Sequence, residues 1–205
     1  MAKSKNRTWI KQHVKDPYVV KSQRDGYRSR ASYKLLEIID NRRLIGPGMT
    51  IIDLGAAPGG WSQVAAKRVG PKGLVVAVDI LPMNPIAGVR FIQGDFTEDE
   101  VLEKLLSEVG DRTVDLVISD MAPNLTGVKA ADQPAVMYLA ELAVDLSRQV
   151  LASEGVFIAK LFQGEGFDEF VRTTRTLFNS VSLKKPDASR AKSREIYLVA
   201  TGLRG

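Results

Sequence analysis

The sequence predicts an α/β fold in which helices cover both faces of a mostly parallel sheet, and two observations lead to this prediction. From residue 50 onward, short runs rich in β-branched residues alternate with segments of helical periodicity. The apolar runs are continuous rather than alternating, which is typical of parallel strands that are buried on both faces. We therefore expect a Rossmann-like α/β sandwich.

The expected elements follow the chain in order. Strands are predicted at Thr50–Leu54, Leu74–Asp79, Arg90–Gln93, Asp115–Ser119 and Val156–Leu161. Helices are predicted near Ser29–Asn41 and near residues 60–69, 98–109, 133–151 and 166–178. Two late runs, Ser180–Lys184 and Ile196–Thr201, predict a closing hairpin that completes a seven-stranded sheet with an antiparallel edge strand.

Composition narrows the class of protein. A chain of 205 residues fits one domain, and no apolar run reaches the ~18 residues of a membrane span. The basic N-terminus has no apolar segment of the kind that secretory signals contain, so we expect a cytoplasmic protein, and without an apolar surface stripe we expect a monomer. With no Cys and one His, we expect no metal site, which leaves acid–base chemistry to carboxylates, Lys or Tyr.

Positive charge is concentrated at the N-terminus. Residues 1–30 hold nine Lys and Arg against two Asp, a net charge of +7, whereas the whole chain carries +5. We expect residues 1–27 to form a basic, partly flexible arm for phosphate backbone, with Tyr18 and Tyr27 as candidates for stacking on bases, and residues 28–205 to form the single domain. A solvated tail is the alternative interpretation of the arm.

Ionisable residues stand at the ends of the predicted strands, where ligands bind in sheets of this kind. Asp53, Asp79 and Asp120 end three strands, and Asp95 follows another. Lys160 ends the fifth, and Glu195 begins the last strand if that strand is antiparallel. Six such groups at one edge exceed what packing requires, so they predict a binding and catalytic site.

The stretch IIDLGAAPGGWSQ at residues 51–63 holds a glycine-rich turn between a strand and a helix. Ala57 replaces the second glycine of a dinucleotide-binding fingerprint and Pro58 removes an N–H, so a pyrophosphate cradle is disfavoured. Asp79 could accept hydrogen bonds from ribose hydroxyls and Asp95 from an adenine amino group. These acceptors, with the negative potential of Asp53, suit S-adenosylmethionine, a nucleoside with a sulfonium centre.

The sequence resembles the FtsJ/RrmJ (RlmE) family of ribosomal RNA 2′-O-methyltransferases. The resembling stretches are RSRASYKLLEI at 28–38, DLGAAPGGWSQ at 53–63, SDMAPN at 119–124, FQGEGFDEF at 162–170 and SRAKSREIYLVATG at 189–202. The resemblance implies a methyltransferase fold that uses S-adenosylmethionine. It also implies, as substrate, a uridine in the A-loop of 23S rRNA, within the large (50S) ribosomal subunit.

The resemblance also implies roles for individual residues. The catalytic set would be Lys34, Asp120, Lys160 and Glu195. The cofactor contacts would be Gly59, Trp61, Asp79, Asp95 and Asp120. Trp61 can alternatively be interpreted as a core aromatic, and Lys34 is the one catalytic residue that strand endings alone did not indicate.

The implied chemistry is an in-line methyl transfer to a 2′-hydroxyl, which needs alignment and a base. A lysine serves as a base only if its pKa falls well below the ordinary value of ~10.4. We hypothesise that Lys160 accepts the proton and is oriented by Asp120, whereas Lys34 and Glu195 position the ribose. Phosphate contacts are expected from the basic arm and from a second cluster, which is Lys184, Lys185, Arg190, Lys192 and Arg194.

Particular residues argue for or against other functions. An amino-methyltransferase loop would need an aromatic residue where Asn124 stands in DMAPN, and Ala57 and Pro58 disfavour an NAD-dependent oxidoreductase. A 2′-O-methyltransferase of another structured RNA, such as tRNA, remains open. A non-catalytic RNA-binding assembly factor or chaperone would not need the Lys-Asp-Lys-Glu set.

Overall fold

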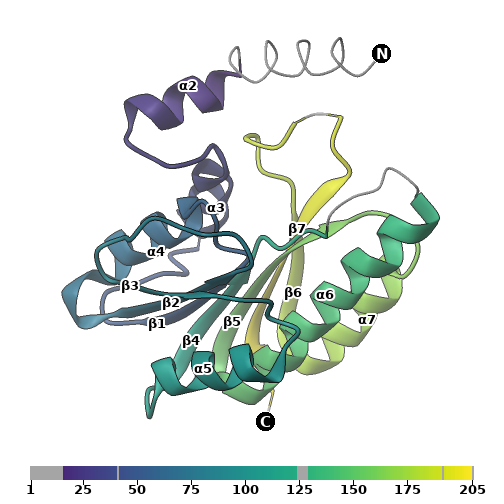
Figure 1. The fold of residues 1–205 in the computed structure, drawn as a ribbon. Coiled ribbons are helices and arrows are strands. Elements are labelled where there is room, and N and C mark those ends of the chain that lie inside the picture. Colours follow the sequence, from purple (N-terminus) through teal and green to yellow (C-terminus); the bar gives the residue numbers. More distant parts are fainter. Residues whose placement is uncertain (1–15, 41, 124–128, 191, 205) are drawn as a thin grey trace.

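A seven-stranded sheet with helices on both faces forms the body of the protein (Figure 1). The computed structural model describes residues 16–40, 42–123, 129–190 and 192–204. The strands are β1 (Thr50–Leu54), β2 (Leu74–Asp79), β3 (Val89–Gln93), β4 (Val114–Ser119), β5 (Leu151–Phe162), β6 (Phe178–Lys184) and β7 (Glu195–Leu203). The helices are α2 (Pro17–Arg24), α3 (Ala31–Asp40), α4 (Gly60–Val69), the 3₁₀ turn η1 (Gly70–Lys72), α5 (Asp99–Val109), α6 (Lys129–Val150) and α7 (Phe167–Leu177).

The strand order is β3-β2-β1-β4-β5-β7-β6. The pairings from β3 to β5 are parallel, whereas β7 runs antiparallel to both β5 and β6. The predicted mostly parallel sheet and its closing hairpin are therefore confirmed. The antiparallel strand β7 lies one place inside the edge, between β5 and β6, which brings the start of β7 next to the end of β5.

Helix α2 was not predicted, and among the predicted strands β5 differs most from expectation. It begins at Leu151, directly after α6, rather than at Val156. Its pairing with β4 shifts register between Val114 and Leu116, and Glu154 has a left-handed φ of 68°. Ser153 and Glu154 are exposed in this irregular part of the strand, so the continuous apolar run on which the prediction rested begins only at Val156.

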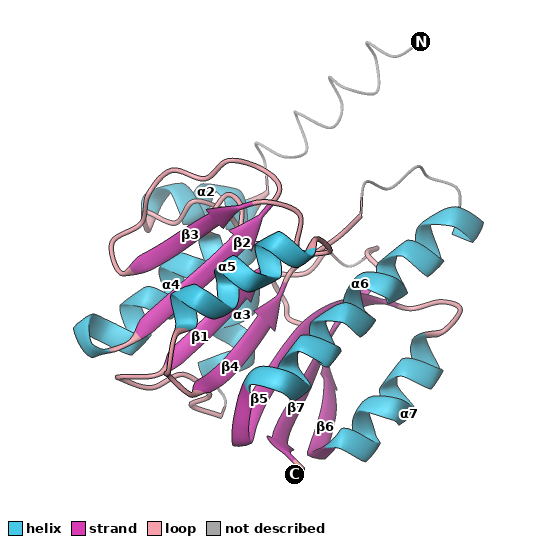
Figure 2. Cartoon of the chain, turned by 60° about the horizontal axis from the view of Figure 1, so that its bottom comes forward, coloured by secondary structure: helices cyan, strands magenta, loops and turns pink. Residues whose placement is uncertain are grey.

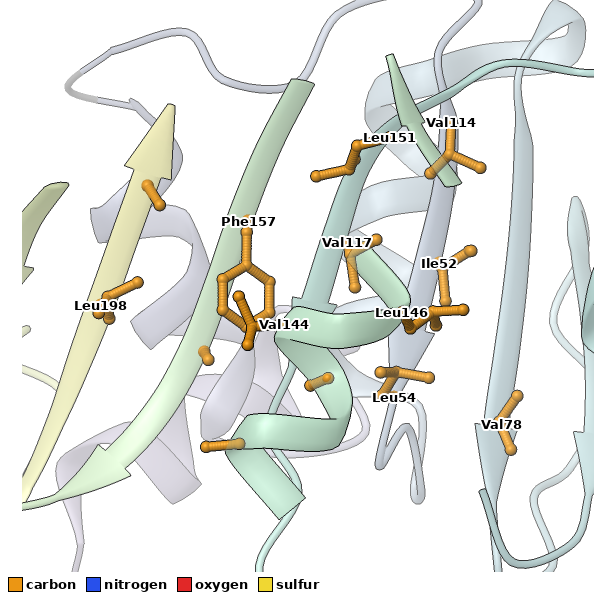
Figure 3. Close-up of a cluster of buried hydrophobic side chains, with 14 of the residues drawn as sticks. Ile52, Leu54, Val78, Val114, Val117, Val144, Leu146, Leu151, Phe157 and Leu198 are labelled. Atoms are coloured by element: carbon orange, nitrogen blue, oxygen red, sulfur yellow. The ribbon is translucent and has the colours of Figure 1, made fainter. Parts of the chain in front are cut away.

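Alternation along the strands divides the core into two layers. Ile51 packs in a cluster with side chains of α3 and α4, whereas Ile52 packs with α6 and its neighbours on the other face. Figure 2 shows α5 and α6 in front of the sheet and α3 and α4 behind it. Figure 3 shows Val144 and Leu146 of α6 against Ile52 and Phe157 of the sheet. The α3–α4 layer is the one that reaches the polar residues discussed below.

Helix α2 packs against α3 at the N-terminal end of the described chain. Asp16 caps α2 through Tyr18 N at 3.0 Å and forms an ion pair with Arg30. The Tyr18 and Tyr33 ring centroids lie 5.6 Å apart, and so do those of Tyr27 and Tyr33. The first fifteen residues of the basic arm lie outside the described residues, as do Asn41 and Asn124, and the arm's role in RNA contact stays a prediction.

Among the described residues, no helix combines the length and the apolar character needed to cross a membrane.

The turn after β1 comes into backbone contact with the turn after β4. Gly55 has a φ of 74°, and a Cβ there would lie 2.8 Å from the Cα atom of Met121. The adjacent Asp120 N–H donates to the Leu54 carbonyl at 3.0 Å. Only glycine permits both this backbone conformation and this approach.

We predict that Gly55→Ala destabilises the protein more than Gly48→Ala does. Gly48 also has a positive φ, of 84°, but a Cβ there would meet nothing within 4 Å. The backbone strain, about 1–2 kcal/mol, is therefore common to both variants, and the clash adds about 1–3 kcal/mol at Gly55 alone. Urea unfolding of both variants measures the difference, and equal losses would show that the contact with Met121 relaxes freely.

Candidate active site

The pairing of β5 with β7 places three polar side chains on one face of the sheet. Lys160 lies directly opposite Tyr197, and Phe162 lies opposite Glu195. Side chains of facing residues in an antiparallel pair project to the same side, and so do residues two apart along a strand. Lys160, Tyr197 and Glu195 therefore share the face that α3 and α4 cover, where Tyr197 is part of the buried cluster.

Two ion pairs meet at this place. Lys34 Nζ lies 2.7 Å from Glu195 Oε1, and Lys160 Nζ lies 3.0 Å from Asp120 Oδ1. Lys160 also donates to the backbone carbonyl of Asp120. The structure thus brings together all four residues that the resemblance implies, and their side chains are only 10–21% exposed.

Tyr197 links the two pairs. Its hydroxyl donates to Asp120 Oδ1 at 3.3 Å, which is the same oxygen that Lys160 approaches. Lys34 Nζ lies 5.7 Å from the centroid of the Tyr197 ring, within cation–π range. Sequence reasoning missed this residue, although its position two residues after Glu195 in a strand places both on one face.

Burial and charge shift the pKa values of two of these groups. Burial alone raises the pKa of the Glu195 carboxyl, but the hydrogen bond and charge of Lys34, aided by Lys160, lower the pKa on balance. Burial, with the nearby charges of Asp120 and Glu195, holds the pKa of the Tyr197 hydroxyl well above its usual range. Tyr197 is therefore a hydrogen-bond donor here, and Glu195 is an anion that keeps Lys34 in place.

Helix α3 carries Lys34 to the sheet because the helix is anchored to α4. Leu35 and Ile38 are buried beside Lys34, and the Ser32 hydroxyl donates to the Gly60 carbonyl at 3.0 Å. Trp61, only 2% exposed, donates its indole N–H to the Ala31 carbonyl at 2.8 Å. The Trp61 side chain thus fits the core interpretation, and a cofactor contact at this residue would use its backbone.

Two of the predicted cofactor residues lie at the ends of β2 and β3, since Asp79 ends β2 and Asp95 follows β3. Asp79 accepts hydrogen bonds from Ala57 N and Leu81 N, each at 2.8 Å, which fixes its carboxylate beside the glycine-rich turn. Asp95 is exposed, and its Oδ1 accepts from the backbone and the hydroxyl of Thr97. Neither carboxylate forms an ion pair with a described residue, and each retains acceptor capacity for a ligand.

Gly59 precedes α4 in a left-handed conformation, with φ 104°. A Cβ at Gly59 would lie 2.6 Å from the Ile86 side chain and 2.8 Å from that of Met83. The segment after β2 therefore packs closely on the glycine-rich turn. The two loops that carry Gly59 and Asp79 form one connected edge of the site.

Asp53 lies fully buried beneath this edge. Its Oδ2 accepts the Ser62 hydroxyl at 2.6 Å, and its Oδ1 has no hydrogen-bond partner. Burial raises the pKa of the Asp53 carboxyl to about 7; the Ser62 hydrogen bond opposes this shift, and the charges of Asp120 and Asp79 add to it. Asp53, Asp79 and Asp120 are thus close enough to interact. The negative potential of these three carboxylates favours a cationic ligand over a phosphate.

Comparisons with known proteins identify the family of this chain. The model of the FtsJ-like methyltransferase family matches residues 27–203. This chain belongs to the FtsJ-like methyltransferase family. The match spans the whole sheet and includes every predicted site residue, so the fold and the site of this FtsJ-like methyltransferase lie within the family's shared region.

Named relatives cover nearly the whole chain. Ribosomal RNA large subunit methyltransferase E of Marinobacter nauticus is 62% identical over 203 residues, which cover 99% of this chain and 98% of that protein. The protein of the same name from Pseudomonas aeruginosa is 58% identical over 206 residues and covers 100% of both chains. A crystal structure described as a ribosomal RNA methyltransferase from Plasmodium falciparum is 32% identical with TM-score 0.79, and the match covers 87% of this chain and 100% of that one.

A cavity of about 710 Å³ lies beside the FtsJ-like site rather than in it. It is lined by α2, α3 and the start of the β6–β7 connection, including Tyr18, Tyr27 and Lys184. None of the four Lys-Asp-Lys-Glu residues lines this cavity. The cavity therefore belongs to the surface around the site, where the tyrosines proposed for base stacking are found.

We predict that Asp53 makes the stability of this methyltransferase pH-dependent. The pKa of Asp53 is about 7 in the folded state and exceeds the ordinary value of 3.8. Between pH 3.8 and about pH 7, Asp53 is therefore protonated in the folded state and ionised in the unfolded state. The free energy of unfolding should therefore fall as pH rises through this window, by up to about 4 kcal/mol, and the loss should be complete above the folded pKa.

Denaturant unfolding at pH 4.5 and pH 8 measures this contribution. Asp53→Asn, which is neutral throughout, should flatten the pH dependence relative to wild type. Ser62→Ala should steepen it, because it removes the hydrogen bond that stabilises the ionised carboxylate. Parallel pH profiles for wild type and Asp53→Asn would contradict the assignment.

Proposed function

We propose that this protein methylates ribosomal RNA of the large subunit, by transferring a methyl group from S-adenosylmethionine to a uridine 2′-oxygen in the A-loop of 23S rRNA. The observation that carries the proposal is the pair of ion pairs, Lys160–Asp120 and Lys34–Glu195, held within one site by Tyr197. Relatives at 62% and 58% identity are named as large-subunit methyltransferases, which supports the substrate class. The 2′-oxygen, the uridine and the A-loop rest on the family resemblance.

The donor set at the strand ends fits S-adenosylmethionine, which would supply an activated methyl group on a sulfonium. Asp79 would accept from ribose hydroxyls and Asp95 from the adenine amino group. The backbone at Gly59 and Trp61 would line the turn. Ile80 and Leu81, next to Asp79, are 55% and 59% exposed and offer apolar surface to the adenosine. Asp120 and Asp53 would add the negative field that suits a sulfonium.

Lys160 is the proposed proton acceptor for the 2′-hydroxyl. Asp120 holds Lys160 Nζ by its carboxylate and by its backbone carbonyl, which fixes the direction of the amine. The Tyr197 hydroxyl donates to the same oxygen of Asp120, so this carboxylate oxygen interacts with both Tyr197 and Lys160. In the proposed step Lys160 would first release its own ammonium proton to solvent. Its neutral Nζ would then accept the proton of the 2′-hydroxyl, while the Lys34–Glu195 pair positions the ribose.

The proposed RNA surface lies around the β6–β7 connection, which projects beyond the end of the sheet near α3 (Figure 1). Lys185 donates to the Ser193 carbonyl, Arg194 donates to the Gln163 carbonyl, and Arg190 lies 3.8 Å from Asp16. These contacts shape the connection itself. Lys184 and Lys192 have no such described contact and are the members of this cluster best placed to hold phosphates.

We predict that Lys160→Ala abolishes transfer of labelled methyl from S-adenosylmethionine to large subunits that lack the modification. Removing a general base costs about 10²–10⁴-fold in rate. Lys160→Arg, which keeps the charge, should be equally impaired. Lys67→Ala, on the exposed side of α4, should retain full activity and serves as the control.

The position of the label decides between the functions. Label at a single A-loop ribose, identified by resistance to alkaline cleavage, would support the proposal. Near-normal turnover by Lys160→Arg would overturn the base role and leave an orienting one. Label on a base, or on tRNA alone, would overturn the substrate, and RNA binding without label would indicate a non-catalytic assembly factor.

We also predict that RNA binding weakens steeply with salt. Each phosphate contact contributes about 0.7–0.9 to the slope of log affinity against log salt concentration. Lys192→Ala should reduce this slope by roughly that amount, whereas Lys104→Ala on α5 should leave it unchanged. Filter binding at several salt concentrations measures both, and salt-independent binding would contradict an electrostatic RNA surface.

A further inference from the structure

Arg28 joins two loops of the proposed cofactor site. It lies between α2 and α3, and its guanidinium donates to the carbonyls of Asn84 at 2.6 Å and Pro85 at 2.7 Å. A third bond, at 3.3 Å, reaches the Pro58 carbonyl in the glycine-rich turn. All three acceptors are main-chain oxygens, so the side chain holds backbone in place and forms no ion pair with a described residue.

The backbone around Arg28 is fastened to the same turn. Arg28 N–H donates to Gln63 Oε1 at 2.7 Å, and Gln63 Nε2 donates to the Gly26 carbonyl at 3.2 Å. Gln63 lies in the first turn of α4, the helix that begins directly after Gly59. Three segments that are distant in sequence, 26–28, 58–63 and 84–85, therefore meet at one junction.

The glycine-rich turn and the segment after β2 are joined at two places, by Asp79 and by the junction at Arg28. Asp79 accepts from Ala57 N in the glycine-rich turn and from Leu81 N in the segment after β2. Arg28 spans the same two segments further along, at Pro58 and at Asn84–Pro85. Next to the Arg28 attachment, the side chains of Met83 and Ile86 lie so close to Gly59 that a Cβ there would have no room.

We propose that Arg28 is a positioning residue of the cofactor site, holding the glycine-rich turn and the segment after β2 at the spacing that S-adenosylmethionine needs. The inference rests on the proposed function. The planar guanidinium presents several donors in fixed directions and can satisfy carbonyls of two segments at once, whereas an ammonium group acts as a point charge. In this proposal Arg28 affects cofactor binding through the backbone of the two loops, although its place in a basic segment suggests a phosphate contact.

The test compares Arg28→Ala and Arg28→Lys with Arg24→Ala. Arg24 is a matched control because it is an exposed arginine of the same segment whose described contact is with Asp25. Calorimetry on the RNA-free protein gives the Kd for S-adenosylmethionine, and steady-state assays give KM and kcat. Filter binding gives the RNA affinity, and thermal unfolding checks that each variant is folded.

Arg28→Ala should raise the Kd and KM for S-adenosylmethionine about tenfold or more, because small displacements of binding groups carry large penalties. The kcat at saturating cofactor should stay within about threefold of wild type, since the Lys-Asp-Lys-Glu residues are untouched. RNA affinity should fall no more than in Arg24→Ala. Arg28→Lys should keep wild-type RNA affinity but lose most of the cofactor affinity.

A cofactor Kd within twofold of wild type in a folded Arg28→Ala would overturn the inference. So would full rescue by Arg28→Lys, which would assign the role to charge rather than to the fork of donors. If Arg28→Ala does not fold, the Arg28→Lys measurement decides. Failure of the wild-type protein to bind S-adenosylmethionine would refute the proposed function itself, and that outcome is distinct from both.

Discussion

The antiparallel pairing of β5 with β7 is the constraint on which the site depends. Its register sets Lys160 opposite Tyr197 and places Glu195 two residues further along, on the same face. A shift by one residue would turn Glu195 and Tyr197 to the opposite face, away from α3. Because β7 is inserted between β5 and β6, this pairing also joins the last strand of the chain to the parallel sheet, in which Asp120 directly follows β4.

The two ion pairs are arranged so that each cation has its own anion. With little solvent around them, the charges of Lys34 and Lys160 would be costly without Glu195 and Asp120 beside them. Tyr197, kept protonated by burial and by its acidic neighbours, adds a donor and no charge. The result is a compact polar cluster whose members hold one another. In the proposed reaction this cluster would preorganise the groups around the 2′-hydroxyl.

The proposed cofactor-binding edge, formed by the loops that carry Gly59 and Asp79, is organised by main-chain contacts as much as by its acidic side chains. Asp79 and Arg28 both hold the glycine-rich turn and the segment after β2, one through a carboxylate and the other through a guanidinium. Gly55 and Gly59 permit the close approaches on either side of that turn. Asp53 is a buried acid near this turn, and the charges of Asp120 and Asp79 contribute to its raised pKa.

The sequence by itself determined the layered α/β fold, because its apolar strands are continuous. The acidic residues Asp53, Asp79 and Asp120 near the strand ends also predicted the edge at which we propose that ligands bind. The register irregularity hid the start of β5, since local patterns do not record which residue pairs across strands. Lys34 was indicated by the family resemblance and not by strand endings, and helix packing brings it to the site. Tyr197 and Arg28 were found only in the tertiary structure, because they reach the site by strand pairing and loop contact. Local sequence specifies which face of an element is apolar, and only the assembled chain decides which polar groups meet there.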